Sequence, residues 1–146
     1  MGNTVRLFAA LVLAMGFLGS GCRTLPPENY AVPHPALSLS EFQKYVRAGK
    51  VPILDAREPA DFQVGYVPDA INFPPGANFY RDYKKLKHLL GPHKEDLVIV
   101  YCVDQWCDRA DELQLQLIAQ GFQHVGRFSG GWLEWQRAKL PETGSR

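Results

Sequence analysis

The segment Leu97–Tyr101 constrains the fold of this chain more than any other feature, because it is apolar or aromatic at every position. A strand on a half-exposed sheet alternates apolar and polar residues, whereas this segment shows no alternation and is rich in β-branched residues. It is therefore typical of a strand covered on both faces. We expect an α/β fold, in which this strand belongs to a central parallel sheet flanked by helices on both faces.

Segments with the length of helices and strands alternate along the chain from Ser38 onward. Ser38 and Glu41 have the Ser-x-x-Glu spacing of a capping box, and Gly49 stands where the helix that it begins would end. Further strands are expected at Val51–Leu54, Ala70–Phe73 and Val125–Phe128, and further helices around Ala60–Val64, 77–90, Ala110–Ala119 and Trp132–Ala138. This alternation predicts a single domain over residues 38–141, with a flexible tail at 142–146.

The first 21 residues have the pattern of an export signal peptide. Arg6 precedes the apolar run Leu7–Leu18, and small residues separate that run from Cys22. The run is shorter than the roughly 20 residues that a membrane-spanning helix needs, although an uncleaved N-terminal anchor is an alternative. A cysteine in this place resembles the lipidated cysteine of bacterial lipoproteins. The resemblance implies a membrane anchor at Cys22 and an outer-membrane lipoprotein that faces the periplasm.

The segment that follows is expected to be an extended tether. Residues 22–37 contain four prolines and no apolar periodicity, which is typical of polyproline-like linkers. The whole chain has a formal net charge of +1, which argues against a nucleic-acid partner. Its oligomeric state is left open by the sequence.

Cys102 is the residue on which the chemistry is expected to depend. It directly follows the segment Leu97–Tyr101, and ligand sites in parallel sheets lie at the carboxyl ends of strands. A helix is expected to begin soon afterwards, and the N–H groups of a helix N-terminus stabilise a thiolate. Cys107 is a second thiol nearby. It either resolves a persulfide or sulfenic acid on Cys102 by forming a disulfide, or packs as a small apolar side chain. Whether the two cysteines form a disulfide is left open, and they are too few to form a structural zinc site.

Several separated motifs together resemble the rhodanese-like domains, a family of sulfurtransferases. The motifs are Leu54–Glu58, Gly65–Pro74, Val100–Cys102, Gly121–Phe122 and Gly130–Trp132 with Trp135. The resemblance implies that Cys102 accepts a sulfane sulfur as a persulfide and passes it to a nucleophile, without a metal or an organic cofactor. It places Asp55 and Arg57 near the site as scaffold residues, for which an ion pair or turn anchor is the plainer interpretation. It also implies an active-site loop made of Val103, Asp104, Gln105, Trp106, Asp108 and Arg109, together with Cys107.

This loop departs from the usual pattern of the family. It contains no glycine, and Asp104 and Asp108 bring negative charge to the place where an anionic donor would bind. We therefore expect thiosulfate to be a poor donor, and a small sulfur donor of another kind or a protein thiol to be the partner. A second cysteine five positions after the first also resembles a two-cysteine subgroup of the family. Two other functions remain open: a thiol–disulfide redox protein that uses Cys102 and Cys107, and a binding module without activity.

Overall fold

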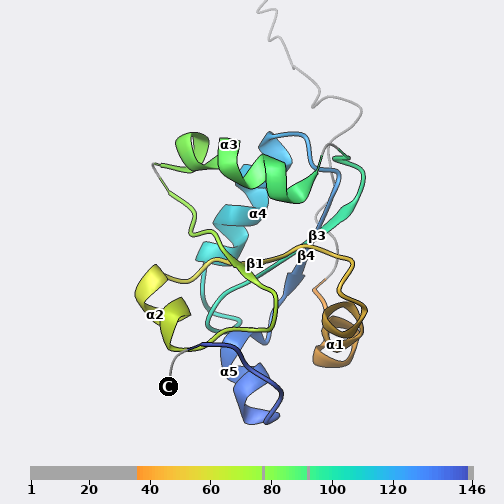
Figure 1. The fold of residues 1–146 in the computed structure, drawn as a ribbon, viewed down its shortest axis with the longest axis vertical. Helices are drawn as coiled ribbons and strands as arrows, with labels where there is room; N and C mark the ends of the chain where they lie inside the picture. The colour runs from red at the N-terminus through yellow and green to blue at the C-terminus, as the bar shows by residue number, and fades with distance from the viewer. Residues whose placement is uncertain (1–35, 77, 92, 145–146) are drawn as a thin grey trace, which may run out of the picture.

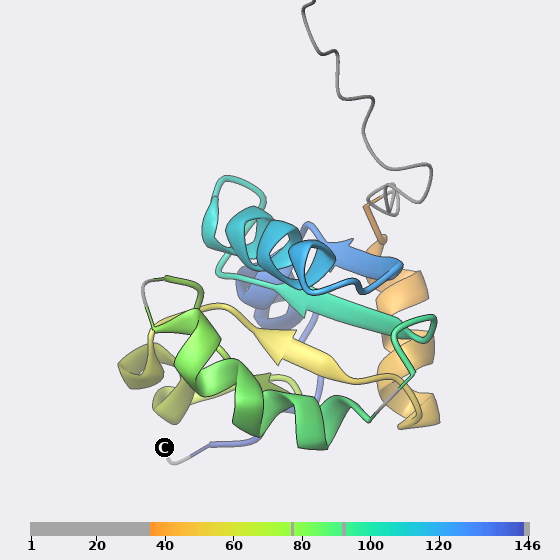
Figure 2. The same ribbon diagram turned by 90° about the horizontal axis from the view of Figure 1, so that it is seen from above.

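The structure is a computed structural model that describes residues 36–76, 78–91 and 93–144. Within this part of the chain, four strands form one parallel sheet in the order β2-β1-β3-β4. The strands are β1 (Ile53–Asp55), β2 (Ile71–Asn72), β3 (Leu97–Tyr101) and β4 (His124–Phe128). The apolar segment is thus an interior strand, with β1 on one side and β4 on the other (Figure 2).

Helices cover both faces of this sheet. They are α1 (Leu39–Ala48), α2 (Pro59–Val64), α3 (Phe79–Leu90), α4 (Arg109–Ala119) and α5 (Gly131–Arg137). The helices α3 and α4 lie on one face and α1 and α5 on the other (Figure 1). Their side chains pack in two separate cores. The predicted α/β fold, a single parallel sheet with helices on both faces, is confirmed.

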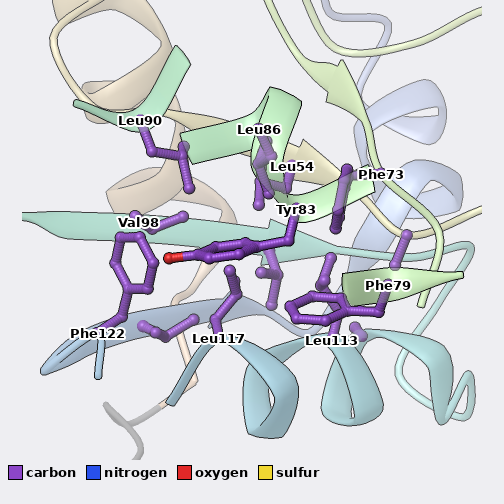
Figure 3. Packing of buried hydrophobic residues seen from close by; sticks show 14 of the residues in the cluster. Leu54, Phe73, Phe79, Tyr83, Leu86, Leu90, Val98, Leu113, Leu117 and Phe122 are labelled. Carbon is purple, nitrogen blue, oxygen red and sulfur yellow. The ribbon is translucent and has the colours of Figure 1, made fainter. Parts of the chain in front are cut away.

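The two faces of β3 belong to two separate hydrophobic cores. Val98, Val100 and the residue after the strand, Cys102, point toward α3 and α4. Ile99 and Tyr101 point toward α1 and α5. Figure 3 shows the first core, in which the leucines of α3 and those of α4 lie on opposite sides of the Tyr83 ring. The absence of a polar alternation in β3 follows from this double coverage.

The first helix is formed as the sequence predicts. The N–H of Glu41 donates to the Ser38 hydroxyl, the N–H of Ser38 donates to the Glu41 carboxylate at 2.9 Å, and Gly49 ends the helix at a φ of +61°. Just before it, Leu37 forms a parallel bridge with Phe128. Leu37 was predicted to end the tether, but it extends the sheet at the β4 edge.

The other boundaries differ little from those predicted, except at the C-terminal end. Thr143 falls in the predicted flexible tail, yet it exchanges two backbone hydrogen bonds with Tyr66, at 2.7 and 2.9 Å. The tail is therefore ordered at least that far by an antiparallel bridge. The predicted signal peptide and Cys22 lie outside the described residues. Within the described ranges, no helix is long and apolar enough to cross a membrane.

Candidate active site

Cys102 lies at the carboxyl end of β3 and is almost completely buried, with 2% of its surface exposed. Its backbone is fixed by the start of α5, because the N–H of Trp132 donates to the Cys102 carbonyl and the N–H of Leu133 donates to the Val103 carbonyl, both at 2.9 Å. The first N–H groups of a helix have no partner inside the helix. Here two of them hold the backbone that carries the cysteine.

Cys102 and Cys107 form a disulfide across a Cα–Cα distance of 6.1 Å. Cys107 is half-buried and packs against the same core as Cys102. The structure thus shows the site in its oxidised form, in which Cys102 has no free thiol. A nucleophile must open the disulfide before Cys102 can attack a substrate.

The loop between the cysteines turns without glycine because Asp104 supplies the turn. Its carboxylate accepts a hydrogen bond from the N–H of Trp106 at 2.9 Å, and its carbonyl accepts one from the N–H of Cys107 at 3.4 Å. None of the residues from Cys102 to Arg109 has a positive φ. The loop therefore has no position that favours glycine, and an Asx turn takes its place.

Arg127 on β4 fixes the same loop through hydrogen bonds to its backbone. Its guanidinium donates to the carbonyls of Gln105 and Cys107, each at 3.1 Å, and forms an ion pair with Asp111 of α4 at 2.9 Å. Sequence reasoning missed Arg127. The available signal was a lone arginine within the expected strand Val125–Phe128, near the carboxyl end of that strand, where Cys102 also lies on its own strand.

Arg109 does not face the cysteines, although its position in the sequence suggested that it lines the loop. Its side chain donates to the Ala56 carbonyl at 2.9 Å and forms an ion pair with Glu58 at 2.7 Å. It therefore joins the start of α4 to the connection after β1. The remaining predicted loop residues lie toward solvent: Val103, Gln105, Trp106 and Asp108 are exposed, with Trp106 at 84%, and Asp104 is half-buried.

Asp55 and Arg57 form a buried ion pair at the end of β1. The Arg57 side chain donates to both carboxylate oxygens, at distances of 2.6 to 3.0 Å, and also to the Gly65 carbonyl at 2.8 Å. Its guanidinium lies 4.7 Å from the centre of the Trp132 ring. Burial by itself would lower the pKa of Arg57, but the hydrogen bonds and charge of Asp55 outweigh it and raise that pKa. The pair anchors a turn and supports Trp132, whose N–H holds Cys102.

A cavity of about 340 Å³ opens beside the loop. It is lined by Asp104, Gln105, Trp106, Gly130, Glu134 and Arg137. Two of these side chains are carboxylic acids and one is a cation, so the cavity has an acidic lining. Among the residues that the structure describes, no three histidine, cysteine, aspartate or glutamate side chains are grouped as metal ligands.

Comparisons with known proteins agree with this geometry. The family model of the rhodanese-like domain matches residues 38–138. The HTH-type transcriptional regulator Rv0324 of Mycobacterium tuberculosis is 29% identical over 109 residues, which are 75% of this chain and 45% of the regulator. This chain therefore spans less than half of that relative.

Two other similarities cover more of the matched protein. The "Putative thiosulfate sulfurtransferase, mitochondrial" of Schizosaccharomyces pombe is 27% identical over an alignment of 113 residues, and the match covers 68% of this chain and 78% of that protein. The crystal structure of the BH2092 protein from Bacillus halodurans superposes with a TM-score of 0.63 at 20% identity, and the match covers 75% of this chain and 76% of that one. The second similarity supports the fold alone.

Proposed function

This chain belongs to the rhodanese-like domain family, and from that premise we propose that it carries sulfane sulfur as a persulfide on Cys102 and transfers it to a nucleophile. The observation that carries the proposal is the position of Cys102, buried at the carboxyl end of β3 with its carbonyl held by the N–H of Trp132. The resemblance to a relative whose printed name is that of a sulfurtransferase supports the same chemistry.

The proposed reaction has two sulfur transfers and no net oxidation. In the reduced site, the Cys102 thiolate attacks the terminal sulfur of a persulfide donor, the S–S bond of the donor breaks, and the donor leaves as a thiolate. An acceptor thiolate then attacks the terminal sulfur on Cys102, and Cys102 leaves as a thiolate. The helix α4 begins at Arg109 without a side-chain cap, and the first N–H groups of a helix, which have no partner within the helix, favour these anionic forms.

The acidic surroundings favour a donor other than thiosulfate. Asp104 and Glu134 line the cavity beside the loop and outnumber its one cation, Arg137. Arg109 and Arg127 are already paired with Glu58 and Asp111. A thiosulfate dianion would meet twice the repulsion of a singly charged donor. We therefore propose a persulfide, whose reacting sulfur group carries a single charge, or a protein thiol as the partner.

The test compares two cysteine variants after reduction. Sulfide release from glutathione persulfide in the presence of excess dithiothreitol is expected to fall to the uncatalysed background in Cys102→Ser. In Cys107→Ser it is expected to stay within a few-fold of the wild type, because Cys107 takes no part in either transfer. Equal rates for the wild type and Cys102→Ser would exclude the proposal. A pure binding module would show no rate above background in any of the three proteins.

The disulfide favours thiol–disulfide exchange as a second candidate function. Titration of the Cys102–Cys107 pair against glutathione buffers distinguishes this function from a structural bridge. A pair that is reduced readily by glutathione fits a redox role, and one that resists reduction fits a structural bridge. The lipid anchor at Cys22 and the envelope location rest on the sequence pattern and stay predictions.

A further inference from the structure

The two cysteines of the disulfide are not equally exposed. Cys102 is 2% exposed and lies among core residues of α3 and α4, whereas Cys107 is half-buried beside the exposed Trp106 and Asp108. A nucleophile from solvent therefore reaches the sulfur of Cys107 first. In thiol–disulfide exchange the other sulfur departs, which makes Cys102 the leaving thiolate.

Cys102 is also the better placed of the two to leave. Its backbone is fixed through Trp132 of α5, so the sulfur stays in the core when the S–S bond breaks. The loop that carries Cys107 is held separately by Arg127, through the carbonyls of Gln105 and Cys107. The Cα–Cα distance of 6.1 Å then keeps both sulfurs within reach of each other after the bond has opened.

The surroundings restrict which nucleophile can make this attack. The loop contains Asp104 and Asp108, the cavity beside it is lined by Glu134 and one cation, Arg137, and the nearby Arg109 and Arg127 are each paired with a carboxylate. Hydrogen sulfide is the smallest sulfur nucleophile, and it carries at most one negative charge near neutral pH. It is therefore repelled less than a dianion, and its small size suits attack on the half-buried Cys107.

We propose that the oxidised site makes its own persulfide from hydrogen sulfide, with the Cys102–Cys107 disulfide as the oxidant. Hydrosulfide attacks the Cys107 sulfur, the disulfide bond breaks, and Cys102 leaves as a thiolate, so that Cys107 holds a persulfide. The Cys102 thiolate then attacks the terminal sulfur of that persulfide, and Cys107 leaves as a thiolate. Sulfide has lost two electrons to the disulfide, and the terminal sulfur is bound to Cys102.

This inference rests on the proposed function, because it assigns the sulfur source of the same persulfide. It adds an activity that the proposed function does not contain. A sulfane donor delivers sulfur that is already oxidised, whereas here the site itself oxidises sulfide. Cys107 is accordingly needed for loading from sulfide and is dispensable for loading from a persulfide donor.

The experiment uses the full chain in its disulfide form, without oxygen, mixed with an equimolar amount of sodium sulfide and quenched by alkylation. Intact-mass and peptide analysis should find one added sulfur on Cys102 in the wild type. No added sulfur is expected in wild-type protein that was reduced beforehand, or in Cys107→Ser, because neither contains the disulfide. In a parallel arm, glutathione persulfide should load Cys102 in both the reduced wild type and Cys107→Ser.

The two arms separate the two claims. If glutathione persulfide loads Cys102 but sulfide leaves the oxidised protein unchanged, or reduces it without adding sulfur, the further inference is wrong and the proposed function stands. If glutathione persulfide fails to load Cys102 in the reduced wild type, the proposed function itself is wrong. Sulfur added equally to the oxidised and the reduced wild type would also overturn the inference, because loading would not depend on the disulfide.

Discussion

At the scale of single residues, Arg57 connects a buried charge to the reactive cysteine. Its partner Asp55 is fully buried, and four hydrogen bonds join the Arg57 main chain and side chain to that carboxylate. Removing one member of such a pair leaves the other charge buried without compensation, which costs about 3–5 kcal/mol. Arg57 also stacks on Trp132, whose N–H donates to the Cys102 carbonyl, so the loss of Arg57 would also disturb the position of Cys102.

We expect Arg57→Met to lower the free energy of unfolding by about 3–5 kcal/mol, measured by urea denaturation. The rate of sulfur transfer should fall as well, because Trp132 loses its support. Arg81→Met is the matched control, since Arg81 pairs with Asp82 on the surface and should change the stability little. If Arg57→Met and Arg81→Met are equally stable, the buried pair does not support the fold in this way.

The sequence identified the cysteines but not the side chains that position them. Cys102 could be found because it follows an apolar strand directly. The positions of Arg127 and Arg109 could not be predicted, because their partners depend on the order of the strands. β4 lies next to β3, so Arg127 reaches the loop that follows β3. β1 lies on the other side of β3, so Arg109 reaches the Ala56 carbonyl after β1. No local spacing in the sequence contains that order.

At the scale of elements, the contact between α5 and the cysteine loop depends on Gly131. This residue begins α5 with a φ of +61°, and a Cβ atom there would lie 2.6 Å from the Cys102 carbonyl oxygen and 2.7 Å from the Asp104 nitrogen. Both neighbours are backbone atoms, which cannot rotate away. The close approach is what allows the N–H of Trp132 to reach the Cys102 carbonyl.

Gly131→Ala and Gly49→Ala form a matched pair for this contact. Both glycines have a φ of +61°, but nothing lies within 4 Å of a Cβ placed at Gly49. Each variant should lose about 1–2 kcal/mol for the left-handed backbone. Gly131→Ala should lose more stability than Gly49→Ala in thermal unfolding, and only Gly131→Ala should lose most of the sulfur transfer, because the loop is displaced. Equal losses of stability and activity in the two variants would contradict this account.

The elements themselves were largely predictable, for reasons that differ along the chain. The helix after Ser38 and the strand Leu97–Tyr101 carry complete local signals, a capping box and an unbroken apolar run. The bridge between Tyr66 and Thr143 carries none, because it joins two single residues through backbone atoms alone. Backbone pairing between distant segments leaves no pattern of side chains to detect.

At the scale of the whole molecule, each face of the sheet buries one tyrosine. Tyr83 lies in the core under α3 and α4 (Figure 3), and its hydroxyl has no hydrogen-bond partner among the described residues. Tyr101 lies in the core on the other face, where its hydroxyl accepts a hydrogen bond from the Val67 N–H at 3.3 Å. Burial raises the pKa of Tyr83, and burial followed by the negative charge of Asp55 raises the pKa of Tyr101 well above its ordinary value.

The free energy of unfolding should therefore fall in alkali. Below pH 10, the ordinary tyrosine value, both states keep these hydroxyls protonated. Above it the unfolded chain releases protons that the folded protein retains, so stability decreases as pH rises. Tyr83→Phe should reduce this decrease in urea denaturation between pH 9 and 11, and should cost little at neutral pH because the buried hydroxyl has no partner. Tyr80→Phe, on an exposed ring, is the control; an equal effect of both variants would refute the assignment.

The complete architecture followed from the sequence more readily than the oxidation state of the site. The alternation of strands and helices predicts a parallel sheet, and this prediction does not depend on the conformation of the connecting loops. A disulfide between Cys102 and Cys107 requires that the intervening loop bring the two Cα atoms within bonding range, and that turn is made by the side chain of Asp104 and held by Arg127. Sequence separation alone does not determine it.

Arg127 has a mechanical consequence as well. Its carbonyl accepts the N–H of Leu37, where the described chain joins the edge of the sheet, and its guanidinium holds the carbonyls of Gln105 and Cys107. A force that pulls on the chain before Leu37 would therefore act on Arg127 through this hydrogen bond, along the direction of β4. Arg127 therefore contacts both the chain that enters the sheet at Leu37 and the loop that carries Cys107, so a force on the first contact would be transmitted to the second.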